Sequence, residues 1–120
     1  MARIEVRDDQ IDIRLSLAEE VLALHGTLHI PLRHVMGVSA EPVPPAAWRG
    51  MRIGTNVPGV VVAGTFFTAE GAVFYDMRHG DRCVTIELAG ERYKRVVVEV
   101  DPGQDPQVVA SEIEAKRQAQ

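Results

Sequence analysis

The residues of this chain that are best suited to bind a ligand lie in and near one glycine- and arginine-bearing segment. Residues 49–59 read Arg-Gly-Met-Arg-Ile-Gly-Thr-Asn-Val-Pro-Gly. Arginine side chains hold anions through paired N–H donors, and glycine lets backbone N–H groups approach an anion closely. Between positions 33 and 54 there are three arginines and one acid, so the local charge is +3 − 1 = +2, opposite in sign to the −4 of the whole chain. The candidate anion site consists of Arg33, Arg49, Arg52, Gly54 and Thr55.

A simpler interpretation of this segment is that its glycines form turns and its arginines cover apolar surface. The phosphate-binding pattern Gly-x-x-x-x-Gly-Lys does not occur in the sequence. We favour the simpler interpretation and keep the anion site as an alternative.

Three histidines, His25, His29 and His34, raise the question of a metal site. The first two are four residues apart, which would suit one face of a helix, but Gly26 is expected to end the helix between them. A closed zinc site needs about four ligands, and the single cysteine is far away in the sequence, at position 83. We predict no metal site and no cofactor.

Nucleophilic catalysis has little support in the sequence. Cys83 is expected on the outer face of its strand, opposite Val84 and Ile86, and His79 lies four residues before it. A catalytic thiol needs a nearby base and a lowered pKa, so an inert surface or half-buried thiol is the favoured interpretation. The serines and the acids offer no clearer pattern; they are Ser16, Ser39 and Ser111, and the dispersed carboxylates Glu70, Asp76 and Glu87. We predict no catalytic residue and a protein that is not an enzyme.

The elements that must position these residues are mostly strands. Apolar residues alternate or cluster in seven stretches, at residues 4–6, 11–15, 29–41, 60–68, 72–78, 83–88 and 96–100. Short turns between them predict an antiparallel sheet that curls or closes into a barrel. Residues 42–58 carry four of the seven prolines and read as a long loop.

Two helices complete the predicted architecture. Ser16 and Glu19 form a capping box for a short helix that ends near Gly26 and covers an open side of the sheet. Asp105 and Pro106 begin a second helix, over residues 105–118, which closes one end of the barrel. Its apolar stripe includes Val109 and Ile113. The 120 residues are predicted to form one domain.

The aromatic side chains mark a candidate interface. Phe66 and Phe67 are adjacent on a strand and therefore point to opposite faces. One face should line the interior, and the other needs cover from residues 17–24, from the segment around Trp48, or from another subunit. The sequence leaves intrachain cover and self-association equally open, with Trp48, Phe66 and Phe67 as the interface candidates.

Charge and composition exclude some classes of protein. A net charge of −4 argues against general nucleic-acid binding, which needs a basic face. One cysteine allows no intrachain disulfide, the first residues have no apolar signal core, and no apolar run approaches the ~20 residues that span a bilayer. We expect a cytoplasmic protein without a transmembrane segment.

The chain resembles a family of small uncharacterised actinobacterial proteins with a bacterial pleckstrin-homology-like fold. The resemblance extends over nearly the whole chain and rests on Ile30-Pro-Leu-Arg-His-Val-Met-Gly-Val38, Arg49-Gly-Met-Arg-Ile-Gly-Thr55, Pro58-Gly59, Gly64-Thr-Phe66, Val73-Phe-Tyr-Asp76 and Tyr93-Lys-Arg-Val-Val-Val-Glu-Val100. It implies a seven-stranded antiparallel barrel capped by the C-terminal helix, and a role in oligomer formation and protein contacts. It assigns no catalytic residue.

The resulting expectation is a non-enzymatic binding or assembly module that contacts another protein or copies of itself. Two alternatives use the same arginines. One is a protein or enzyme that binds a small anionic ligand at the segment from Arg49 to Gly59, and the other is docking on an anionic membrane surface.

Overall fold

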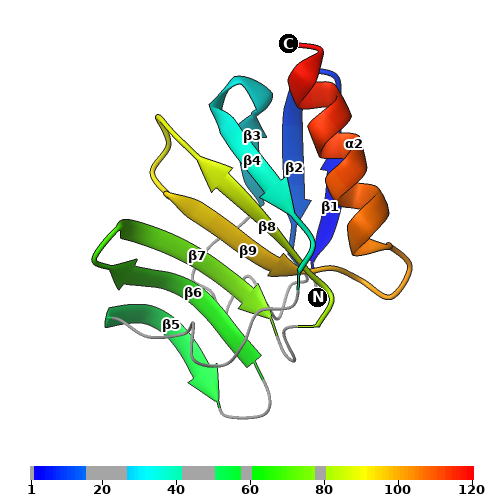
Figure 1. The fold of residues 1–120 in the computed structure, drawn as a ribbon. Coiled ribbons are helices and arrows are strands. Elements are labelled where there is room, and N and C mark those ends of the chain that lie inside the picture. The colour runs from blue at the N-terminus through cyan, green and yellow to red at the C-terminus, as the bar shows by residue number, and fades with distance from the viewer. Residues whose placement is uncertain (1, 16–26, 42–50, 58–60, 78–80) are drawn as a thin grey trace.

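The computed structural model describes residues 2–15, 27–41, 51–57, 61–77 and 81–120, with the backbone alone described for 51–57 and 61–63. Within these ranges the chain is mainly β, with one α-helix near its C-terminal end (Figure 1). The strands are β1 (Arg3–Val6), β2 (Gln10–Arg14), β3 (Leu28–Pro31), β4 (Val35–Ser39), β5 (Met51–Val57), β6 (Val61–Thr68), β7 (Gly71–Met77), β8 (Cys83–Leu88) and β9 (Arg95–Glu99). The helical elements are the 3₁₀ turn η1 (Leu32–His34) and the helix α2 (Pro106–Gln118).

The strands form two sheets. The smaller has the order β1-β2-β3, and the larger has the order β4-β8-β9-β7-β6-β5. In Figure 1 the larger sheet runs from β4, next to the small sheet and α2, to β5 at the far end. An isolated bridge between Ala2 and Val100 joins the start of the chain to the end of β9.

This arrangement confirms the prediction of a mainly β fold with a C-terminal helix. The number of strands and their pairing differ from the prediction. The described residues form nine strands in two open sheets, where the sequence predicted seven antiparallel strands in one barrel. β9 lies between β8 and β7 and runs parallel to β7, so β7 and β8 follow each other in the chain without pairing. Alternation shows which residues of a strand share a face, but it does not show which strands pair.

The predicted single strand over residues 29–41 is two strands. β3 pairs with β2 in the small sheet, η1 redirects the chain, and β4 pairs with β8 in the large sheet. Pro31 ends β3, because proline has no N–H to continue a ladder. The chain changes from the small sheet to the large one after this residue.

The predicted long loop over residues 42–58 contains a strand. β5 pairs with β6 residue for residue from Met51↔Phe67 to Val57↔Val61, and Gly54 lies opposite Gly64. The sequence MRIGTNV has no clear alternation. Its pairing partner therefore determines its conformation more than its own propensity does, as is common for strands.

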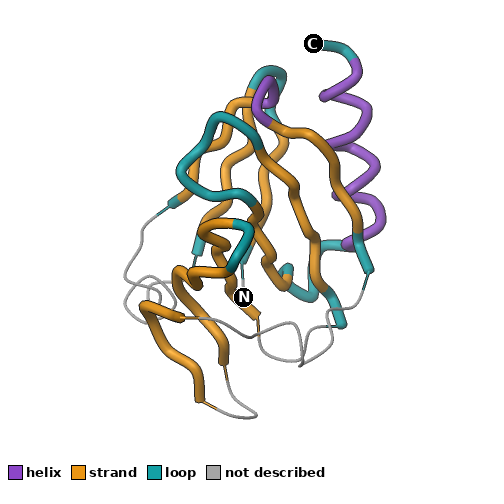
Figure 2. Tube along the Cα trace, turned by 60° about the vertical axis from the view of Figure 1, so that its left-hand side comes forward, coloured by secondary structure: helices purple, strands orange, loops and turns teal. Residues whose placement is uncertain are grey.

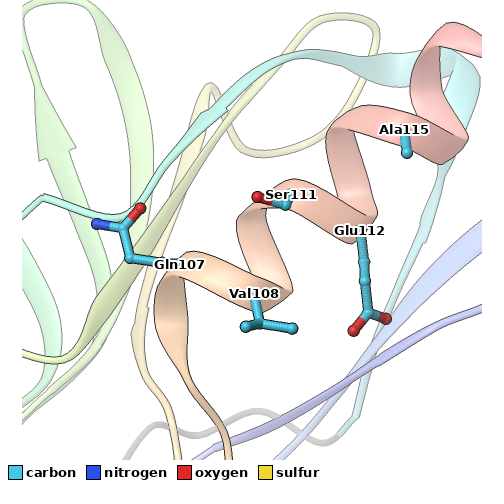
Figure 3. A pocket seen from close by; sticks show the side chains of 5 residues that line it. All are labelled: Gln107, Val108, Ser111, Glu112 and Ala115. Carbon is cyan, nitrogen blue, oxygen red and sulfur yellow. The ribbon is translucent and has the colours of Figure 1, made fainter.

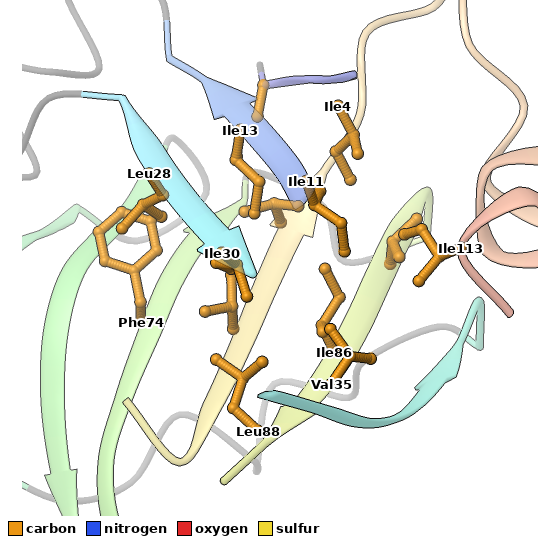
Figure 4. Packing of buried hydrophobic residues seen from close by; sticks show 14 of the residues in the cluster. Ile4, Ile11, Ile13, Leu28, Ile30, Val35, Phe74, Ile86, Leu88 and Ile113 are labelled. Carbon is orange, nitrogen blue, oxygen red and sulfur yellow. The ribbon is translucent and has the colours of Figure 1, made fainter. Parts of the chain in front are cut away.

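The main core lies between the two sheets and α2. It contains buried apolar side chains from both ends of the chain, from Ala2 to Ile113. In Figure 4, Ile11 from the small sheet, Ile86 from the large sheet and Ile113 from the helix point into the same interior. Removing this apolar surface from water is the main term that stabilises the fold.

Helix α2 begins and packs as the sequence predicted. The side chain of Asp105 accepts a hydrogen bond from the Gln107 N–H at 2.9 Å, and Pro106 follows at the first helical position. Val109 and Ile113 are 5% and 0% exposed, which confirms their predicted burial. Figure 2 shows α2 flanking the strands at one side.

The opposite face of the large sheet carries a second, smaller cluster of buried side chains. Its members are Phe66, Val73, Tyr75, Met77, Cys83 and Val97. The rings of Phe66 and Tyr75 meet edge to face, with centroids 5.1 Å apart. The two intrachain segments predicted to cover this face, residues 17–24 and the segment around Trp48, lie outside the described residues.

Candidate functional site

The outer edge of β1 is covered by one side chain. The Ile4 N–H donates to Gln104 Oε1 at 2.9 Å, and Gln104 Nε2 donates to the Ile4 carbonyl at 2.8 Å. The primary amide thus supplies the donor and the acceptor that a neighbouring strand would supply. Arg82 holds the segment of Gln104 in place by donating to the backbone carbonyls of Asp101 (3.2 Å) and Gln104. The side chain of Gln104 therefore opposes the addition of a strand at Ile4.

The outer edge of β4 has no neighbouring strand among the described residues, but α2 lies beside the end of the strand, where Val38 and Ser39 line a hollow together with Gln107, Ala110 and Ser111. β4 pairs with β8 on one side, and within the described residues no strand pairs on its other side. Met36 is 53% exposed and Ser39 is exposed. A Cβ placed on Gly37 would meet no heavy atom within 4 Å among the described residues. An edge strand of this kind presents backbone N–H and C=O groups to a partner.

A bulge shapes β4. Its pairing with β8 shifts register between Val35 and Gly37, so Met36 is the extra residue of the strand. Bulges at sheet edges redirect side chains, and here Met36 is turned toward solvent. The far end of β4 approaches α2, where Gln107 Nε2 lies 3.4 Å from the Ala40 carbonyl.

The residues of the predicted anion site are spread over the large sheet. Arg33 is exposed in η1, directly before β4, whereas Arg52, Gly54 and Thr55 belong to β5. β4 and β5 are the two outermost strands of this sheet, with four strands between them. Arg49 lies outside the described residues, and the side chains of Arg52 and Thr55 are not described. Anion binding by residues 49–59 therefore stays a prediction, but Arg33 belongs to another region.

The two phenylalanines point to opposite faces of β6, as their adjacency implies. Phe66 is fully buried in the second cluster, and Phe67 is 43% exposed. Phe67 lies opposite Ala72 on β7 and Met51 on β5. It is the outward member of the pair, which the sequence left open. Trp48, the third predicted interface residue, lies outside the described residues.

Two of the three histidines bind carboxylates. His34 Nδ1 contacts Glu91 Oε2, and His29 Nδ1 donates to Asp12 Oδ1 at 2.8 Å. Hydrogen bonds from His29, Arg7 and Gln10 lower the pKa of the buried Asp12 carboxyl to about 2. Within the described residues no group of three or more His, Cys, Asp and Glu side chains could hold a metal ion. His25 lies outside them.

Cys83 is more deeply buried than the sequence predicted. It is 0% exposed, with Sγ 3.8 Å from Met77 Sδ. The expectation of a surface or half-buried thiol is wrong because the second cluster covers the face of the large sheet at Cys83, the first residue of β8. Burial, followed by the charges of Glu99, Asp81 and Asp76, raises the pKa of Cys83 to about 12. A thiol with this pKa is not a nucleophile near neutral pH.

Two of the three dispersed carboxylates, Glu70 and Glu87, pair with the same arginine, Arg95. Arg95 Nε donates to Glu87 Oε1 at 2.7 Å, and Arg95 Nη2 lies 3.7 Å from Glu70 Oε2. Asp76, the third, is 1% exposed on β7. The arginine pairs with both glutamates, so the arrangement is that of an ion-pair network and not of an acid–base pair.

The outer face of α2 carries a shallow hollow of about 390 Å³ (Figure 3). Its lining residues all come from the helix; they are Gln107, Val108, Ser111, Glu112 and Ala115. Val108 is 52% exposed. Walls from a single helix enclose little of a small ligand, in contrast to the concave pockets that bind metabolites.

In comparisons with known proteins, no family model, curated protein or solved structure matches the chain. No helix of the described residues is long and apolar enough to cross a membrane.

Proposed function

We propose that this chain is a non-enzymatic binding and assembly module that contacts protein through the outer edge of β4. The observation that carries the proposal is the contrast between the two edges. Gln104 occupies the backbone groups of Ile4 on β1, whereas β4 exposes Met36 and an open Gly37. Addition of a strand to a sheet edge is a common mode of protein recognition, in which backbone hydrogen bonds supply affinity.

The proposal includes a relationship to pleckstrin-homology-like domains. It is supported by a mainly β chain whose C-terminal helix inserts Val109 and Ile113 into the core. A seven-stranded barrel of that kind would require pairings different from the two sheets described here. The strand neighbours of β9 are the feature that tests this relationship.

The test of the proposed function compares two substitutions at similarly exposed apolar residues. Met36→Lys places a charge on the edge of β4, and lysine at an edge opposes strand addition. Val108→Lys places the same charge on the outer face of α2 and is the matched control, since the two residues are 53% and 52% exposed. We expect Met36→Lys to reduce protein association and Val108→Lys to leave it unchanged.

Association is measured in two ways. Light scattering coupled to size exclusion reports self-association of the purified chain, and cross-linking in extracts of the source cells reports other partners. The proposal fails if both measurements give the same result for the unmodified chain and for Met36→Lys.

A further inference from the structure

A second hollow, of about 220 Å³, lies between β3 and the turn that joins β8 to β9. Its lining includes Leu28, His29 and Ile30 on one side and Leu88, Arg92 and Tyr93 on the other. The hollow on α2 is lined by one helix, whereas this one has walls from two parts of the chain that are far apart in the sequence. We infer that it binds a small carboxylate with an apolar body, which is a function separate from protein association through β4.

The floor of this hollow is apolar. Leu28, Ile30, Leu88 and Tyr93 are between 3% and 6% exposed and belong to the main core. Figure 4 shows Leu28 and Ile30 of β3 and Leu88 of β8 within this core. One water occupies about 30 Å³ in the liquid, so the hollow has the volume of about seven waters. That volume suits a ring or a short hydrocarbon chain, whose contact with the floor removes apolar surface from water.

Arg92 supplies the charge at the rim. Its guanidinium carbon lies 5.4 Å from the centroid of the Tyr93 ring, so the cation is held beside the apolar floor. Among the described residues no carboxylate pairs with Arg92, whereas the neighbouring Glu91 contacts His34 Nδ1. A guanidinium can donate two parallel N–H bonds to one carboxylate. The rim therefore favours an anion next to an apolar body.

The outer edge of β3 adds a backbone donor to the same hollow. The Leu32 N–H donates to the Asp9 carbonyl at 2.9 Å, and the register continues with Ile30 opposite Ile11 and His29 opposite Asp12. Hydrogen-bonded and non-hydrogen-bonded pairs alternate along an antiparallel ladder. The backbone N–H of His29 therefore points away from β2, toward the side where no strand pairs within the described residues. An N–H in this position can donate to a ligand in the hollow.

The experiment titrates the isotope-labelled full chain with phenylacetate and follows the backbone amide signals by nuclear magnetic resonance. Phenylacetamide has nearly the same shape without the charge, and 2-phenylethylamine carries the opposite charge. We expect phenylacetate to cause saturable shifts at residues 27–30 and 88–93, with a dissociation constant of about 1 mM, as is common for so small a ligand. The other two compounds should bind at least about tenfold more weakly, because they lose the charge-assisted bonds to Arg92.

Arg92→Gln removes the cation at an exposed position and should weaken phenylacetate binding about tenfold. Arg3→Gln makes the same change at an exposed arginine of β1 and should leave binding unchanged. Because both residues are exposed, both variants should keep the fold, and amide signals away from the substitution check this.

Several results would overturn the inference. They are the absence of saturable shifts around the hollow, equal binding of the three compounds, and unchanged binding by Arg92→Gln. Shifts concentrated at residues 51–57 would place the anion site in the segment from Arg49 to Gly59 instead. Tighter binding of 2-phenylethylamine would identify Glu91 as the charged group that selects the ligand. None of these results bears on association through β4, which the comparison of Met36→Lys with Val108→Lys tests separately.

Discussion

Gln104 and Ile4 form a pair of hydrogen bonds across 100 positions of the sequence, one from each group of the side-chain amide to the backbone of β1. This pair fixes the segment before α2 to the first strand, and it removes an open edge from the small sheet. At β4 the described contacts include one long hydrogen bond just beyond the strand, from Gln107 Nε2 to the Ala40 carbonyl at 3.4 Å. The two edges therefore lead to opposite expectations when they are mutated.

Gln104→Ala should destabilise the fold. The Ile4 N–H and carbonyl would lose their partners, and a lost hydrogen bond to a partly buried group costs about 1–2 kcal/mol. The free energy of unfolding, measured by urea denaturation, checks this. Gln107→Ala is the control, because Gln107 makes one long contact of 3.4 Å, and it should change stability by less than about 0.5 kcal/mol. Equal effects of the two variants would contradict the role of Gln104.

Local sequence patterns correctly predicted the elements whose conformation is determined by their own residues. Strands β1, β2 and β8 and helix α2 all lie where the sequence predicted them, and α2 even begins at the predicted cap, Asp105. The pairing of β9 with β7, the strand β5 and the division at Pro31 were missed. These features depend on contacts between distant parts of the chain, which single-sequence periodicity does not report.

The candidate site was missed for a related reason. The sequence drew attention to arginines and glycines, whereas the outer edge of β4 is defined by the absence of a neighbouring strand among the described residues. A weak signal did exist, since VMGVS is an uncharged stretch between Arg33 and Glu41. The cover of β1 by Gln104 has no signal in the sequence, because nothing local links positions 4 and 104.

Ile113→Asp should unfold the protein, and Val108→Asp should not. Both residues lie on α2, but Ile113 is 0% exposed in the main core and Val108 is 52% exposed. An unpaired carboxylate in an apolar core is among the few single changes that cost more than about 4 kcal/mol. Circular dichroism and thermal unfolding compare the two variants. A folded Ile113→Asp protein with an unchanged melting temperature would contradict the packing of α2.

Cys83 should be unreactive while the protein is folded. Its thiol is fully buried, and burial raises its pKa to about 12, so almost no thiolate is present at pH 8. Labelling with a thiol-specific reagent should therefore be slow in buffer and fast in high urea, where the chain is unfolded and the thiol has an ordinary pKa. A fast reaction in buffer, at a rate equal to that in urea, would show an accessible thiol and reopen the question of nucleophilic chemistry.

Asp12 should make the stability depend on pH in the acid range. Hydrogen bonds from His29 and Arg7 lower its pKa from 3.8 to about 2 in the folded state, so the folded state binds the proton more weakly than the unfolded chain does. The resulting stabilisation is present in full above about pH 4 and is lost as the pH falls through 4 toward 2. Because the side chains of Arg7 and His29 are 51% and 60% exposed, solvent screening reduces the contribution to about 1–2 kcal/mol.

Asp12→Asn should therefore lower the free energy of unfolding at pH 7 by about this amount and by much less at pH 2. Asp9→Asn, at an exposed residue in the turn between β1 and β2, is the control. A difference between Asp12→Asn and the unmodified chain that stays constant from pH 7 to pH 2 would show that the carboxylate is not stabilised in this way.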